Sequence, residues 1–112
     1  MSSILEDVKK AIGPSASYEI FDQEIIMHIN TVLFELNQLG VGPDKPFVIE
    51  DDSAEWSDFA TGAAAEACKS YVCLQTRMYF DPPTSGTLIN AMNDQLKKLE
   101  WRLNVAVDPG DE

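Results

Sequence analysis

The stretch FDQEIIMHINTVLFELNQLG, residues 21–40, has the clearest structural pattern in the chain. Its apolar side chains recur at spacings of three and four and so share one side of a helix: Phe21, Ile25, Ile29, Val32, Leu36 and Leu39, with Ile26 and Leu33 widening the stripe. Polar residues fall on the other faces, namely Asp22, Gln23, Asn30, Glu35 and Asn37. The pattern predicts an amphipathic helix over about residues 20–40, and Gly40 closes it.

Upstream of this helix, a shorter one is predicted over residues 3–12. Ser3 and Glu6 have the spacing of a capping box, in which the two residues satisfy backbone N–H groups at a helix start. An apolar stripe follows, made of Ile4, Leu5, Val8 and Ile12. Gly13 and Pro14 end the segment. A helix this short needs to pack on another element to persist.

Two further helices are predicted downstream, over about residues 61–80 and 85–104. The first has Ala64, Cys68, Tyr71, Val72, Gln75, Met78 and Tyr79 on one side and stops at Asp81, Pro82 and Pro83. The second has an apolar stripe of Leu88, Ile89, Met92, Leu96, Leu99 and Leu103. For residues 41–60 a short β-hairpin fits, and an ordered loop fits nearly as well. Residues 105–112 are expected to form an extended C-terminal arm.

These segments predict an all-α fold in a single domain spanning residues 1–112. We expect a small bundle of three main helices, 20–40, 61–80 and 85–104, plus the short N-terminal helix. The 112 residues suffice for one domain with a buried core. No apolar run approaches the roughly 20 residues of a membrane span, and the opening MSSILEDVKK does not resemble a signal peptide. We therefore expect a soluble protein that stays inside the cell where it is made.

The charge balance is strongly acidic. Nineteen Asp and Glu against eight Lys and Arg give a formal net charge of −11. Affinity for DNA grows with the number of cationic contacts to phosphates, so specific nucleic-acid binding is disfavoured. Three interpretations stay open: an ordinary soluble surface, a partner with a basic face, or a surface that must not adhere to DNA.

The sequence lacks the patterns of an enzyme or a metal site. His28 is the single histidine, and Cys68 and Cys73 point about 140° apart if they share a helix. The acidic run of Asp51, Asp52, Glu55 and Asp58 lacks the central glycine of a calcium loop. Neither a phosphate-binding loop nor a nucleophile elbow is present. We expect no catalysis, no cofactor and no bound metal.

Two tryptophans are candidates for contacts with other molecules. Trp101 lies about 170° from the centre of the apolar stripe on its helix, which would leave the indole on the outer face. It could pack on the first helix or the hairpin, or it could anchor a subunit interface, where tryptophan is enriched. Arg102 could pair there with an acid of the next subunit. Trp56, in the acidic loop, has the same ambiguity.

Four pieces of the sequence together resemble a known family. They are LNQLGVGP (36–43), WSDF (56–59), YFDPPTSG (79–86) and KLEWRLNVAVDP (98–109). The resemblance covers nearly the whole chain, and the order and spacing of the pieces agree with the family. The family is that of the head–tail connector proteins, also called adaptor or head-completion proteins, of long-tailed double-stranded DNA bacteriophages. The resemblance implies a helical protein that assembles as a ring, usually twelve-fold, beneath the portal protein of the filled head. It implies a location in the virion neck after synthesis in the bacterial cytoplasm.

The resemblance also implies partners for particular segments. The ring would extend the channel for passing double-stranded DNA, which acidic groups facing the lumen would repel without specific binding. We expect Val105, Ala106, Val107, Asp108 and Pro109 to dock on the portal. The loop residues expected to contact a neighbouring subunit or the next neck or stopper protein are Phe47, Val48, Ile49, Asp51 and Asp52. The two ends could also be exchanged.

A different class of function fits the charge equally well. A small acidic helical protein can be an inhibitor or DNA mimic that occupies the basic groove of a DNA-binding protein. That function predicts a monomer or dimer whose binding collapses when salt is added. The connector function predicts aromatic and aliphatic contacts between subunits that survive salt.

Overall fold

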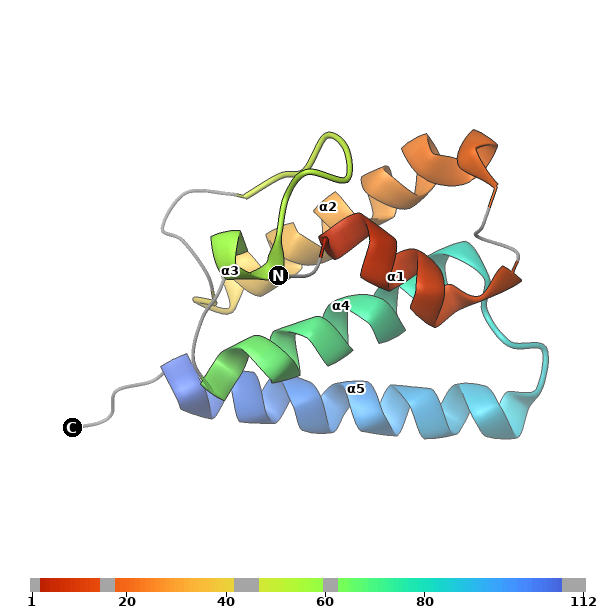
Figure 1. Cartoon of the computed structure of the whole chain (residues 1–112). Coiled ribbons are helices and arrows are strands. Elements are labelled where there is room, and N and C mark those ends of the chain that lie inside the picture. Colours follow the sequence, from red (N-terminus) through yellow and green to blue (C-terminus); the bar gives the residue numbers. More distant parts are fainter. Residues whose placement is uncertain (1–2, 15–17, 42–46, 60–62, 108–112) are drawn as a thin grey trace.

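The computed structural model describes residues 3–14, 18–41, 47–59 and 63–107 and is built from helices (Figure 1). In chain order these are α1 (Ile4–Ile12), the 3₁₀ turn η2 (Glu19–Phe21), α2 (Asp22–Gln38), α3 (Trp56–Phe59), α4 (Ala63–Phe80) and α5 (Gly86–Val107). The described residues form no strand, and their only β feature is an isolated bridge between Ser3 and Glu55. The predicted all-α fold is confirmed. No helix in these ranges has the length and apolar character needed to cross a membrane.

Helix ends follow the capping residues in the sequence. Ser3 Oγ accepts a hydrogen bond from the backbone N–H of Glu6 at 3.3 Å, and Ser85 Oγ accepts one from Leu88 at 3.3 Å. At the end of α2, the N–H of Gly40 bonds to the carbonyl of Asn37 and the N–H of Val41 to that of Leu36, both at 3.0 Å. This is a Schellman motif, which needs a left-handed residue, and Gly40 has φ 88°.

Helix α4 lies at the centre of the bundle. It packs against α1, α2 and α5, and in Figure 1 α2 and α5 lie above and below it. The core contains Ile4, Leu5, Val8 and Ile12 from α1; Ile25, Ile26, Ile29, Val32, Leu33 and Leu36 from α2; Cys68, Tyr71 and Val72 from α4; and Leu96, Leu99 and Leu103 from α5. Burial of these side chains against α4 supplies most of the driving force for the fold.

Helix α5 departs from the prediction at both ends. Leu88 is exposed, whereas the spacing placed it in the buried stripe. It lies about 50° from the mean direction of Met92, Leu96, Leu99 and Leu103, and it sits in the first turn. At the other end α5 continues to Val107, three residues into the expected extended arm. Val105, Ala106 and Val107 contain no helix breaker, and the first residue that opposes helix is Pro109, which disfavours the helical conformation at the residue before it.

For residues 41–60 the sequence left two alternatives open, a β-hairpin and an ordered loop. In the described part of this segment, residues 47–55 form an ordered loop and α3 follows. The side chain of Asn30 on α2 holds Ile49 by two hydrogen bonds, Ile49 N–H to Oδ1 at 2.8 Å and Nδ2 to the Ile49 carbonyl at 3.1 Å. The N–H of Ile4 bonds to the carbonyl of Ala54 at 3.0 Å. Because side chains and α1 satisfy this backbone, the loop needs no partner strand.

Candidate functional site

The outer face of α5 carries an exposed tryptophan among basic residues. Trp101 lies opposite the buried stripe and is 68% exposed, so of the two alternatives left open by the sequence, packing on the first helix or the hairpin is the one that the exposure disfavours. Lys97 and Lys98 lie one turn before it and Arg102 directly after it, and all three are exposed. These four residues form the basic edge of α5. They include three of the eight Lys and Arg of a chain with net charge −11.

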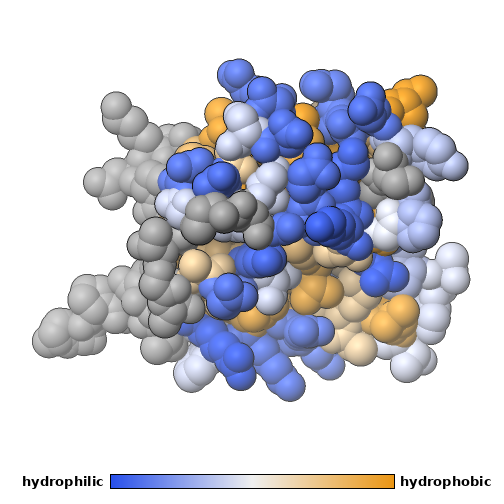
Figure 2. All heavy atoms as spheres, in the orientation of Figure 1, coloured by the Kyte–Doolittle hydropathy of each residue, from blue (hydrophilic) through white to orange (hydrophobic). Residues whose placement is uncertain are grey.

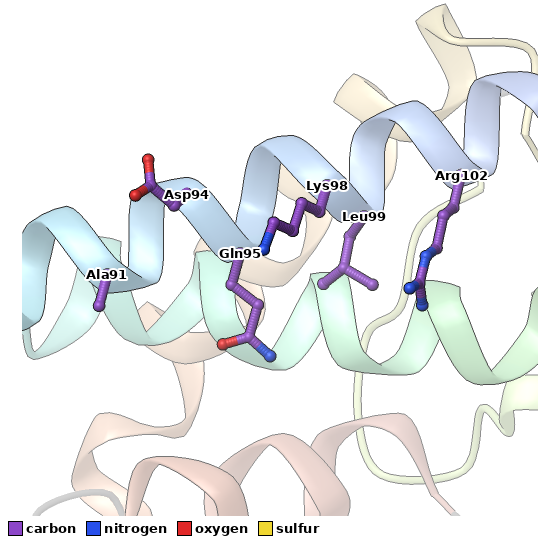
Figure 3. A pocket seen from close by; sticks show the side chains of 6 residues that line it. All are labelled: Ala91, Asp94, Gln95, Lys98, Leu99 and Arg102. Atoms are coloured by element: carbon purple, nitrogen blue, oxygen red, sulfur yellow. The ribbon is translucent and has the colours of Figure 1, made fainter.

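A shallow hollow adjoins the basic edge. Its volume is about 510 Å³, and its lining residues are Ala91, Asp94, Gln95, Lys98, Leu99 and Arg102. Figure 3 shows Gln95, Leu99 and Arg102 projecting from the same side of α5. The lining combines a small apolar floor with charged groups of both signs, a composition that suits another protein surface better than a small apolar ligand.

Trp56 has the opposite environment and is not available as an interface anchor. It is 7% exposed, and its indole Nε1 donates a hydrogen bond of 2.8 Å to Asp7 Oδ2 on α1. Asp7 also lies 3.4 Å from Lys69 Nζ on α4. The expectation that Trp56 belongs to a subunit interface is therefore corrected, because its ring and its polar group are both satisfied inside the subunit.

A second exposed apolar surface lies on η2 and α2, and the sequence reasoning missed it. Ile20, Met27 and Phe34 are exposed although α2 is otherwise buried on its apolar side. Met27 and Phe34, seven residues apart, lie within about 20° of one direction on the solvent side of α2, and Ile20 lies seven residues before Met27 in the η2 turn that leads into the helix. We call these three residues the α2 row. The repeat was visible in the sequence, but it lay outside the larger stripe that faces the core.

The α2 row lies in an acidic neighbourhood. Glu24, one turn before Met27, is exposed. No Lys or Arg occurs anywhere in residues 11–44. Figure 2 shows apolar atoms beside hydrophilic ones at the upper right of the surface, where α2 begins in Figure 1. The combination of an apolar line with acidic surroundings is the reverse of the basic edge of α5.

The loop residues singled out from the sequence divide into buried and exposed groups. Ile49 is 3% exposed and belongs to the core, and Phe47 packs on Phe59 with ring centroids 5.5 Å apart. Ile49 is therefore unsuited to a contact with another molecule, which corrects the expectation made for it, whereas Phe47 is half-buried and stays a candidate. Val48, Asp51 and Asp52 are exposed.

Asp51 and Asp52 border an acidic hollow of about 250 Å³ beside the first turns of α2. The hollow is lined by Leu5, Glu6, Lys9, Glu19, Asp22, Gln23, Ile26, Glu50, Asp51 and Asp52. Lys9 Nζ lies 2.7 Å from Asp22 Oδ1, and this bond raises the pKa of the lysine. The hydroxyl and then the backbone N–H of Ser53 bond to Asp51 and lower the pKa of its carboxyl. The hollow therefore keeps a surplus of negative charge at neutral pH.

Of the residues expected to dock on the portal, Val105, Ala106 and Val107 form the last turn of α5. Asp108 and Pro109 lie outside the described residues. The helical part of this set directly continues the helix that carries the basic edge.

The histidine and the two cysteines of the chain pack against other side chains of the subunit. His28 Nε2 lies 3.6 Å from Glu24 Oε2, and its ring packs beside Tyr79 and Phe80. Burial raises the pKa of both Cys68 and Cys73 to about 11, which keeps the thiols protonated and poorly nucleophilic. In the part of the chain that the structure describes, no three His, Cys, Asp or Glu side chains gather as a metal site.

Comparison with known proteins identifies a family. The model of the family described as "Phage connector protein" matches residues 4–110. This range includes every helix of the structure, the basic edge of α5 and the α2 row. No curated protein and no solved structure matches the chain.

Proposed function

The chain belongs to the phage connector protein family, and we propose that it forms a ring beneath the portal that joins the phage head to its tail. Family membership makes it a structural phage protein of the head–tail region that associates with other head and tail proteins. The observation that carries the proposal is the family match over residues 4–110, nearly the whole chain.

The ring would be held by contacts between copies of this chain, twelve in the arrangement usual for such proteins. The exposed Trp101 supports this proposal, because an indole on an outer face is costly for an isolated soluble subunit and is a common anchor at interfaces. Arg102, next to it, would pair with an acid of the neighbouring copy.

Contacts above and below the ring are assigned to the remaining segments. Val105, Ala106, Val107, Asp108 and Pro109 would dock on the portal. Val48, Asp51 and Asp52 would meet a neighbouring subunit or the next neck or stopper protein. The surplus of acidic groups supports a DNA channel that repels phosphates, so that duplex DNA slides through without being held.

Native mass spectrometry of this protein, alone and mixed with the portal protein of the same phage, tests the proposal. We expect a complex with a ring-sized number of copies on the portal that persists in moderate salt, because apolar contacts are not screened. Absence of binding at every mixing ratio would refute the connector function. Binding instead to a basic DNA-binding protein, lost when salt is added, would establish the acidic inhibitor in its place.

A further inference from the structure

We propose that the basic edge of α5 (Lys97, Lys98, Trp101 and Arg102) docks on the α2 row (Ile20, Met27 and Phe34) of the next copy of this chain. This inference rests on the proposed ring and adds to it the identity of the two surfaces that meet. It assigns Trp101 a receiving surface, which neither its sequence position nor the family match provides.

The first argument is that both surfaces expose large apolar side chains that the described part of the subunit leaves uncovered. Ile20 is 83% exposed, Met27 58% and Phe34 49%. Scattered exposed apolar residues are ordinary, but here two lie on the same side of α2 and a third lies in the η2 turn directly before that helix. Methionine and phenylalanine offer the adaptable, polarisable contacts that suit an indole ring.

The second argument is charge complementarity. The surroundings of Trp101 are basic on balance, because Lys97, Lys98 and Arg102 outnumber Asp94 and Glu100 there, and Glu100 accepts a hydrogen bond from Tyr71. The α2 row has Glu24 beside it and the acidic hollow next to the first turns of α2. Contact between two copies of the α2 row would place acids against acids. Contact between two copies of the basic edge would place lysines and arginine together. The pairing of one surface with the other brings surfaces of opposite net charge into contact, which favours it over both symmetric pairings.

The third argument is the position of the two surfaces in the subunit. Helices α2 and α5 pack on opposite sides of α4, so their outer faces point away from each other (Figure 1). A subunit with different, complementary surfaces on opposite edges associates head to tail. Head-to-tail contacts generate a ring when the rotation between subunits closes. The geometry of one subunit is therefore compatible with the proposed ring.

Cross-linking between introduced cysteines tests the pairing. Thr31→Cys lies between Met27 and Phe34 on α2, and Lys98→Cys lies one turn from Trp101. Both sites are exposed, and both substitutions leave the apolar anchors in place. The variants are assembled on the portal protein of the same phage and treated with a short bismaleimide. The unsubstituted chain, with only Cys68 and Cys73, gives the background.

Head-to-tail pairing predicts a distinct pattern for each sample. The double variant should give a ladder of cross-linked multimers up to the full ring. A mixture of the two single variants should give dimers only, and each single variant alone should give none. A matched control joins Thr31→Cys to Thr87→Cys, about 16 Å along α5 from position 98, and should give no ladder.

Two results would overturn the pairing while leaving the ring intact. One is a portal-bound double variant that forms no ladder, both with Lys98→Cys and with Lys97→Cys as a second choice. The other is dimer formation by a single variant alone, which indicates a symmetric contact. Failure of the unsubstituted chain to bind the portal is distinguishable from both, because it removes the proposed function and this inference with it.

Discussion

The indole Nε1 of Trp56 donates a 2.8 Å hydrogen bond to the carboxylate of Asp7, 49 residues earlier in the chain. The bond joins α3 to α1 beside Lys69 of α4, whose Nζ lies 3.4 Å from the same oxygen of Asp7. One carboxylate thus joins three helices at the point where the loop returns to the bundle.

The first prediction concerns this bond. Asp7→Ala should lower the free energy of unfolding by about 1–3 kcal/mol, because it leaves a buried indole N–H without its acceptor. Urea unfolding measures the change. In a Trp56→Phe background the N–H is absent, so Asp7→Ala should cost less there. An equal cost in both backgrounds would show that the hydrogen bond does not contribute.

The second prediction concerns Trp101. Trp101→Ala should change the free energy of unfolding by no more than about 0.5 kcal/mol, because the side chain is exposed. It should weaken assembly on the portal by roughly 10- to 30-fold, as expected for an aromatic anchor at an interface. Sedimentation with the portal measures assembly. Leu88→Ala is the matched control, since it removes another exposed apolar side chain from α5, and it should assemble normally.

The third prediction separates the end of α5 from the residues beyond it. Deletion of residues 108–112 leaves α5 entire, whereas deletion of 105–112 removes its last turn. If docking uses the whole proposed set, both deletions should keep the helical circular dichroism, and the longer one should reduce portal binding further. Portal binding by the longer deletion at the level of the full chain would retire the assignment of Val105, Ala106 and Val107 to docking.

The fourth prediction concerns alkaline pH. Burial raises the pKa of Cys68 and Cys73 to about 11 from 9.0; burial first, and then Glu100, raises that of Tyr71 above its usual 10.0. A raised pKa means that the folded state holds the proton longer than the unfolded state. The contribution of these protonated groups to the free energy of unfolding is fully present below about pH 9 and decreases as the pH rises toward 11.

Urea unfolding between pH 7 and pH 11 measures this dependence. Tyr71→Phe removes a titrating group and should make the decline above pH 10 shallower. The comparison uses slopes, because the variant also loses the 2.9 Å hydrogen bond from Tyr71 to Glu100. A free energy of unfolding that stays constant up to pH 11 would contradict the prediction.

The sequence predicted the helices well because their signals are local. The stripe of α2, the cap at Ser3 and the end at Gly40 depend on residues within a few positions of one another, and all three were confirmed. The position of Trp101 opposite the buried stripe was predictable for the same reason, although the sequence left open whether another element covers it. It follows from its angle to the leucines of its own helix.

The errors arose where a distant residue decides the environment. Trp56 lies among acidic residues in sequence, and its burial depends on Asp7 in α1. The loop at Ile49 is ordered by Asn30, which sequence periodicity placed on a polar face. The α2 row is a different case, since a seven-residue repeat outside the core stripe was present but was not interpreted.

Helix α5 has a consequence for hydrogen exchange. It packs mainly on α4 through one side, while α4 is enclosed by α1, α2 and α5. Backbone amides of α5 should therefore exchange with deuterated water sooner than those of α4 in the lone subunit. A neighbouring subunit bound to the basic edge would slow exchange in the turns of α5 around Trp101. Slower exchange of these amides would therefore report that two subunits have associated.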